Sequence, residues 1–151
     1  EFVHMYQIGR EQFIVFVSTV IGVLATDLLV GIGIGILVKA IIHVINGAPV
    51  SSLFKPSMRV ENEGDDSATI KVDNSAIFST WIALKNRIAR PSTKKVIVDL
   101  SGTKLVDHTV MANLEALERE FAESDRELSV TGLDGHSHLS EHPLAARKKS
   151  N

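Results

Sequence analysis

The sequence predicts a protein of two parts: a membrane α-helical hairpin, followed by a small α/β domain with a mixed sheet and covering helices. Two observations carry this prediction. Between Gln12 and Val38 the only charged residue is Asp27, whereas Lys, Arg, Asp and Glu are frequent from Ser52 onward. In the second half, segments with the periodicity of strands alternate with segments that have the periodicity of helices.

The overall composition hides this contrast. A hydrophobic content of 44%, a net charge of −2 and a mean hydropathy of +0.14 are typical of an ordinary soluble protein. The absence of cysteine excludes disulfides and thiol chemistry. A net charge near zero gives no support for a nucleic-acid partner, so we expect none. Because the chain starts at Glu1 without an initiator methionine, we expect it to be a piece of a longer protein.

The apolar run from Phe13 to Gly47 is too long for one straight membrane span. As a single helix it would measure roughly 50 Å, against a hydrocarbon core of about 30 Å. Thr26 and Asp27 offer a break, since either side chain can cap a new helix. We therefore predict that residues 1–47 end a transmembrane region, with spans near Phe13–Leu24 and Leu28–Ile45, and that the lipid bilayer is a partner.

Two spans place both flanks of the hairpin on one side of the membrane. The flanks carry basic side chains and one histidine: Arg10, Lys39, His43, Lys55 and Arg59. The positive-inside rule then predicts that these flanks and the following domain lie in the cytoplasm.

Three glycines follow the break, at Gly31, Gly33 and Gly35. They form no phosphate loop, because neither a preceding strand nor a following Gly-Lys-Ser/Thr is present. Glycines in a membrane helix allow a neighbouring helix to approach closely. We expect close helix packing at all three.

The segment 48–57 reads as a linker to an α/β domain at 58–151. Ser67–Val72 has the composition of a strand. A stripe of apolar residues at helical spacing follows and ends before Pro91: Ile77, Trp81, Leu84 and Ile88.

The rest of the domain repeats this alternation. Lys95–Leu100 is typical of a buried strand, and Ser101–Thr103 is predicted to turn the chain at its carboxyl end, where these residues are weak candidates to line a ligand crevice. Leu128–Thr131 forms another strand, closed by Gly132. Between them lies a second amphipathic helix marked by Val110, Leu114, Leu117 and Phe121.

The stretch VIVDLSGTKLVDHTVMANL resembles the central signature of STAS domains, which sulfate transporters share with anti-sigma factor antagonists. The upstream hairpin, REQFIVFVSTVIGVLATDLLVGIGIGILVKAIIHVI, is similar to the last two membrane helices of bacterial SulP inorganic-anion transporters, especially in its portion ATDLLVGIGIGIL. The ending GLDGHSHLSEHPLAARK resembles the tail of SulP proteins with short STAS domains. The resemblance, with hairpin, linker and STAS pattern in this order, covers almost the whole chain. The resemblance implies the C-terminal part of a secondary-active SulP transporter for sulfate, bicarbonate or a related anion.

The same resemblance implies where the chemistry lies. In SulP proteins the anion sits between two broken helices upstream of this segment, so no anion-binding residue is named here. The STAS domain is expected to regulate or assemble the transporter, as a homodimer in the inner or plasma membrane and with a cytoplasmic regulatory protein as a candidate partner. The alternative is a membrane-anchored STAS signalling module that resembles anti-sigma factor antagonists.

Asp107, His108 and Thr109 place an acid, an imidazole and a hydroxyl side by side at a predicted helix start. A hydrolytic triad needs side chains that converge in space, so we expect no enzyme and take Asp107 as a helix cap. The resemblance places Thr109 on the residue that anti-sigma factor antagonists phosphorylate, with His108 in place of the usual Ser and Val110 in place of Gly. These three residues are therefore the candidate regulatory site.

Three histidines cluster near the C-terminus, at His136, His138 and His142. Zinc is held by three or four N, O or S ligands, so this cluster is a weak candidate metal site. Its spacing matches no standard zinc module. We therefore expect no cofactor.

Overall fold

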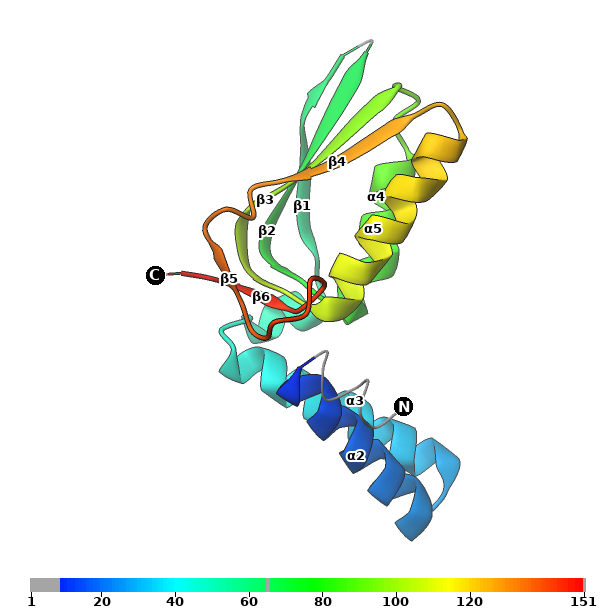
Figure 1. The fold of residues 1–151 in the computed structure, drawn as a ribbon, viewed down its shortest axis with the longest axis vertical. Coiled ribbons are helices and arrows are strands. Elements are labelled where there is room, and N and C mark those ends of the chain that lie inside the picture. Colours follow the sequence, from blue (N-terminus) through cyan, green and yellow to red (C-terminus); the bar gives the residue numbers. More distant parts are fainter. Residues whose placement is uncertain (1–8, 65, 151) are drawn as a thin grey trace.

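The computed structural model describes residues 9–64 and 66–150. The first eight residues of the predicted transmembrane part, together with Asp65 and Asn151, lie outside the described residues. A helical hairpin is followed by a mixed sheet with helices, which confirms the predicted fold class (Figure 1).

The hairpin consists of α2 (Arg10–Ala25) and α3 (Leu28–Ile45). Thr26 ends α2, and its hydroxyl donates to the carbonyl oxygen of Gly22 at 2.7 Å. Asp27 begins α3, because its carboxylate accepts the backbone N–H of Val30 at 3.0 Å and so satisfies a donor that the helix start leaves free. The predicted break and its capping residue are confirmed.

Two of the three glycines allow α2 and α3 to pack closely against each other. A Cβ atom on Gly31 would lie 2.6 Å from the backbone nitrogen of Val23, and one on Gly35 would strike the side chain of Thr19. A Cβ on Gly33 would meet no atom within 4 Å. The prediction of close packing is correct for Gly31 and Gly35 and wrong for Gly33. Successive residues of a helix are rotated by about 100°, so Gly33 lies roughly on the opposite side from Gly31, whereas Gly35 returns to nearly the same side.

The predicted linker contains a short 3-10 helix, η1 (Val50–Leu53). Ala48 and Leu53 are buried in a small apolar cluster with Ile77 and Leu105 from the α/β domain, and Ala40 of α3 packs against this cluster. The segment therefore packs between the hairpin and the domain.

In the described part of the chain, six strands form one sheet in the order β1-β2-β3-β6-β5, and β4 pairs with the first part of β3. β2 runs parallel to β3, as does β4, whereas β1 and β6 are antiparallel to their neighbours. The strand bounds are Ser57–Glu63 (β1), Ser67–Ala76 (β2), Lys95–Val106 (β3), Glu127–Thr131 (β4), His136–His138 (β5) and Arg147–Lys149 (β6).

Two helices cover one face of this sheet, and no described helix covers the other, which we call the open face (Figure 1). They are α4 (Trp81–Ala89), which follows the 3-10 helix η2 (Phe78–Thr80), and α5 (His108–Glu123). Buried residues alternate along β2 and the first part of β3, as expected for strands with one covered face. The main core joins these strands to the predicted apolar stripe of α5 and to Leu84 and Ile88 of α4.

The predicted turn at Ser101–Thr103 is wrong. These residues continue β3, which reaches Val106 because β2 pairs with it along one edge while β4 and β6 pair with the other. A Cβ on Gly102 would strike the Asp73 side chain, so this glycine serves a close approach between strands and not a turn. Since β3 ends at Val106, Ser101–Thr103 do not lie at the strand end where the ligand crevice was suggested.

Candidate functional site

The candidate site is built around the carboxylate of Asp107, at the start of α5. One oxygen, Oδ1, accepts the backbone N–H of Val110 at 2.8 Å, and the other, Oδ2, accepts the backbone N–H of Phe78 at 2.8 Å. The side chain is fully buried. Asp107 thus caps α5 as the sequence predicts, and it also fixes the segment that leads into α4.

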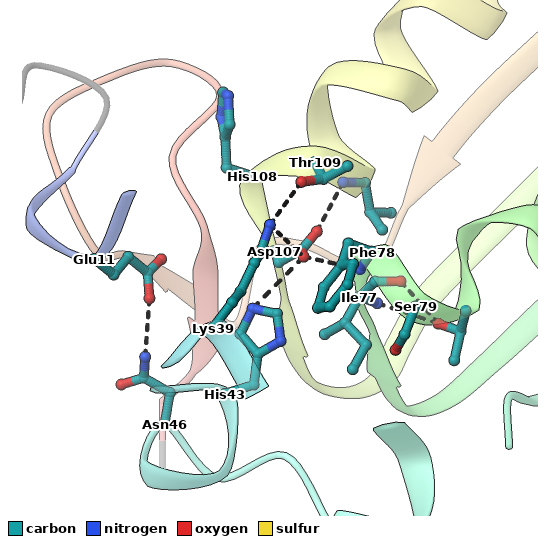
Figure 2. Close-up of polar contacts among 12 residues, drawn as sticks. Glu11, Lys39, His43, Asn46, Ile77, Phe78, Ser79, Asp107, His108 and Thr109 are labelled. Carbon is teal, nitrogen blue, oxygen red and sulfur yellow. Dashed lines mark hydrogen bonds and ion pairs between the residues drawn. The ribbon is translucent and has the colours of Figure 1, made fainter. Parts of the chain in front are cut away.

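The hairpin supplies two basic side chains to the same carboxylate (Figure 2). Lys39 Nζ and His43 Nε2 each lie 3.5 Å from Asp107 Oδ2. The two residues are four positions apart in α3, so they project from the same face of the helix. Both are largely buried, and the charge of Lys39, which is removed from water in this way, requires a partner.

Thr109 and Phe78 complete the cluster. Lys39 Nζ donates a hydrogen bond to Thr109 Oγ1 at 2.9 Å and lies 4.7 Å from the centre of the Phe78 ring. The His43 ring is 5.7 Å from the same aromatic ring. Phe78 therefore covers the cluster with a face that attracts cations.

Further hydrogen bonds surround this contact. Asn46, at the C-terminal end of α3, donates to Glu11 of α2 at 3.1 Å and so ties the two ends of the hairpin together (Figure 2). The hydroxyl of Ser79 donates to the carbonyl oxygen of Leu53 at 2.5 Å. Together with the apolar cluster of Ala48, Leu53, Ile77 and Leu105, these bonds make the hairpin, the linker and the domain a continuous packed unit.

Asp107, His108 and Thr109 point in different directions. His108 Nδ1 lies 2.6 Å from the carbonyl oxygen of Leu144, and since that oxygen only accepts, the imidazole donates to it. Asp107 faces Phe78 and the hairpin, and the Thr109 hydroxyl faces Lys39. Their side chains therefore do not converge as a nucleophile, base and acid would.

The three C-terminal histidines have separate environments. His136 is buried, and its Nε2 lies 2.9 Å from the carbonyl oxygen of Thr103. His142 Nδ1 accepts the backbone N–H of Leu144 at 3.1 Å, and its ring meets His108 edge-on. His138 is exposed. Within residues 9–64 and 66–150 no group of three or more His, Cys, Asp or Glu side chains is arranged to hold a metal ion.

A second carboxylate, Asp99, lies on the open face of the sheet. Burial raises its pKa, but the hydrogen bonds from the amide and hydroxyl of Ser101 and the nearby Lys71 ammonium outweigh burial, so the pKa of Asp99 lies below its ordinary value. This carboxylate holds the β3 backbone and has no contact with the hairpin cluster.

Sequence reasoning missed the partners of Asp107. Lys39 and His43 entered only as flanking charges of the second span, and Phe78 was not singled out. The usable signal was their spacing, a Lys and a His four residues apart at the end of an otherwise uncharged helix. Such a pair predicts a buried anionic partner, but the sequence does not say which acid it is.

Solved structures that are similar to this chain include the following two. The antisigma-factor antagonist STAS domain from Rhodobacter sphaeroides matches with a TM-score of 0.47 and 15% identity, over 56% of this chain and 95% of that chain. The structure of SLC26A9 matches with a TM-score of 0.36 and 12% identity, over 87% of this chain and 26% of that chain, so this chain spans about a quarter of its length. No protein-family model and no curated protein matches the chain. Both TM-scores are below 0.5 and both identities below 25%, so neither likeness identifies a family.

Proposed function

We propose that the chain is the C-terminal part of a secondary-active inorganic-anion transporter of the SulP type. In this proposal α2 and α3 are its last two membrane helices, and the STAS-like domain regulates or assembles the transporter from the cytoplasm. The membrane is the inner or plasma membrane, the transported anion is sulfate, bicarbonate or a related ion, and the protein acts as a homodimer. The motifs of the hairpin and of the β3–α5 segment support this assignment, and so does the contact between the two parts.

The surface of the hairpin supports a membrane environment. Large apolar side chains are exposed along α3, among them Leu29 at 80% and Ile45 at 74%. Soluble proteins rarely leave such a continuous apolar surface in water. Of the described helices, only α3 is long and apolar enough to cross a membrane by length and composition.

The length of α3 favours a larger bundle over a simple anchor. Its 18 residues measure roughly 27 Å, slightly less than a hydrocarbon core of about 30 Å. The polar contacts with the α/β domain begin at Lys39, which leaves Leu28–Val38, roughly 16 Å, to face apolar surroundings. Such a short segment is more stable against further membrane helices than alone in lipid.

The single observation that carries the regulatory role is the Asp107 carboxylate. It caps α5, holds the segment before α4 and receives Lys39 and His43 from α3. A displacement of α3 within the membrane would therefore change the contacts that hold two helices of the domain. Coupling between the hairpin and the domain requires an element whose arrangement both parts influence. The Asp107 carboxylate is such an element, because it contacts both parts.

The test uses the full-length protein, including the coding sequence upstream of Glu1, reconstituted in proteoliposomes. We expect uptake of radiolabelled sulfate, bicarbonate or chloride, and a changed uptake rate in the Asp107→Asn variant. Asp99→Asn is the matched control, because it neutralises a carboxylate of the same domain away from the hairpin. Absence of uptake of all three anions would reject transport. Uptake with equal rates in the Asp107→Asn variant and the wild type would reject the regulatory role alone.

One observation favours a second candidate function, the membrane-anchored signalling module. The Thr109 hydroxyl lies at the start of α5 and accepts a hydrogen bond from Lys39. A phosphate on Thr109 would lie beside a lysine and the positive end of a helix, both of which stabilise it. Phosphoproteomics of the intact protein with its partner kinase tests this function, and an unmodified Thr109 would reject it.

A further inference from the structure

Two adjoining hollows lie between the strand β1 and the helix α4, away from the Asp107 cluster. Their volumes are about 420 and 280 Å³. Met58 and Val60 of β1 form one wall, and Arg87 and Arg90 line both hollows from the opposite side. Pro56 and Pro91 border the groove, which we define as the β1–α4 groove.

The two arginines of this groove carry positive charges that no described acidic side chain pairs with. Among the described residues neither forms an ion pair, whereas Lys85 on the same helix pairs with Glu120 at 4.0 Å. The buried Nε of Arg87 has no hydrogen-bond partner in the described part of the chain. A cation near a helix C-terminus is favourable in itself. Two of them around one hollow, one with an unused donor, point to an anionic ligand.

The other wall of the groove is a free strand edge. β1 pairs with β2, and no other described strand pairs with β1. The register shifts between Val60 and Asn62, so Ser57–Val60 is the regular part of this edge. The backbone groups of an unpaired edge are ready to pair with a strand from another chain.

We propose that the β1–α4 groove binds an acidic segment of another protein in extended conformation. The segment adds to the free edge at Ser57–Val60 and turns alternate acidic side chains into the groove. Their methylene groups pack on Met58 and Val60, and their carboxylates lie at Arg87 and Arg90. An open groove with a strand edge and two cations suits a peptide better than a small enclosed ligand. The inference does not depend on anion transport, because none of these residues contacts the hairpin cluster.

The test measures fluorescence anisotropy of a labelled peptide with the full chain in detergent micelles at low salt. The probe alternates Glu with Val and Ile over eight residues. Two control peptides carry Lys in place of Glu, or N-methylated backbone amides. The variants are Arg90→Gln, an exposed site just after the helix, and the double variant Arg87→Gln/Arg90→Gln. Lys85→Gln is the matched control, since it removes a cation of α4 that lies outside the groove.

We expect saturable binding of the acidic probe, weakened about fivefold by Arg90→Gln and more by the double variant, with no change in Lys85→Gln. The Lys peptide and the N-methylated peptide should bind at least tenfold more weakly. Equal affinity in the Arg90→Gln variant and the wild type would overturn the role of the arginines. Equal affinity of the N-methylated peptide would overturn strand addition. A lack of saturable binding of the acidic probe would overturn the whole proposal.

Discussion

Replacing Asp107 by alanine removes a side chain that contacts the hairpin, the start of α5 and the segment before α4. Two hydrogen bonds are lost at once, from the backbone N–H groups of Val110 and Phe78, each at 2.8 Å. Loss of the cap costs about 1 kcal/mol. An amide left without a partner in a buried site costs roughly 1 to 3 kcal/mol more. Lys39 keeps its hydrogen bond to Thr109, so we take the two backbone terms alone, and the expected loss of unfolding free energy is at least roughly 2 to 4 kcal/mol.

The only tryptophan of the chain reports this loss. Trp81 begins α4, directly after η2, and packs partly buried against the main core. Urea unfolding of the full chain in detergent micelles, followed by Trp81 emission, gives the free energy of unfolding of the α/β domain. The Asp107→Asn variant keeps one oxygen acceptor and should therefore lose less than Asp107→Ala.

Asp27→Ala provides the matched control. Asp27 is also a helix cap, but it is exposed and accepts only the backbone N–H of Val30. Its removal should weaken the start of α3 by about 1 kcal/mol and leave the Trp81 transition in place. A loss below about 1.5 kcal/mol for Asp107→Ala would refute the assignment of both buried hydrogen bonds to this carboxylate.

Three further changes test the hairpin, the sheet and the core. Gly31→Ala drives a Cβ into the backbone of α2 and should destabilise the hairpin by about 1 to 3 kcal/mol in thermal unfolding followed by circular dichroism, whereas Gly33→Ala meets open space and should not. The pKa of Asp99 is lowered in the folded state, since its bonds with Ser101 outweigh burial, so the stability that Asp99 contributes is present above the ordinary pKa and is lost as the pH falls through the pKa of the folded state. Urea midpoints measured between pH 7 and 3 should therefore fall less in Asp99→Asn than in the wild type. An equal fall in both would contradict the lowered pKa. Leu114→Ala empties a site that is 1% exposed and should cost about 2 to 5 kcal/mol in urea unfolding, with a change below 1 kcal/mol as the contrary result.

Patterns of residues close together in the sequence predicted the elements whose buried residues recur at regular helical spacing or whose ends are capped locally. The stripe of Val110, Leu114, Leu117 and Phe121 is the buried face of α5, and the Thr26–Asp27 break separates α2 from α3. These signals are local, because helix periodicity and capping depend on residues three or four positions apart.

Elements held by distant partners were not predicted. β1, β5 and β6 are short or polar strands that become strands through pairing, and the second half of β3 replaces a predicted turn for the same reason. Ile77 carries the apolar period of the predicted helix but lies before it, in the cluster that contacts the linker and the hairpin. Tertiary pairing overrides local propensity at such places.

The sequence by itself determined the two-part organisation, the hairpin break and the Asp107 cap, because each follows from charge distribution, chain length or contacts within one helical turn. Only the tertiary structure decided what Asp107 faces. Lys39 and His43 are more than 60 positions away along the chain, and they meet the carboxylate because the linker packs the end of α3 against β3 and η2. Contacts at such separations depend on how the hairpin and the α/β domain pack together. The sequence therefore predicts Asp107 as a helix cap, but only the folded chain shows that it also joins the two parts.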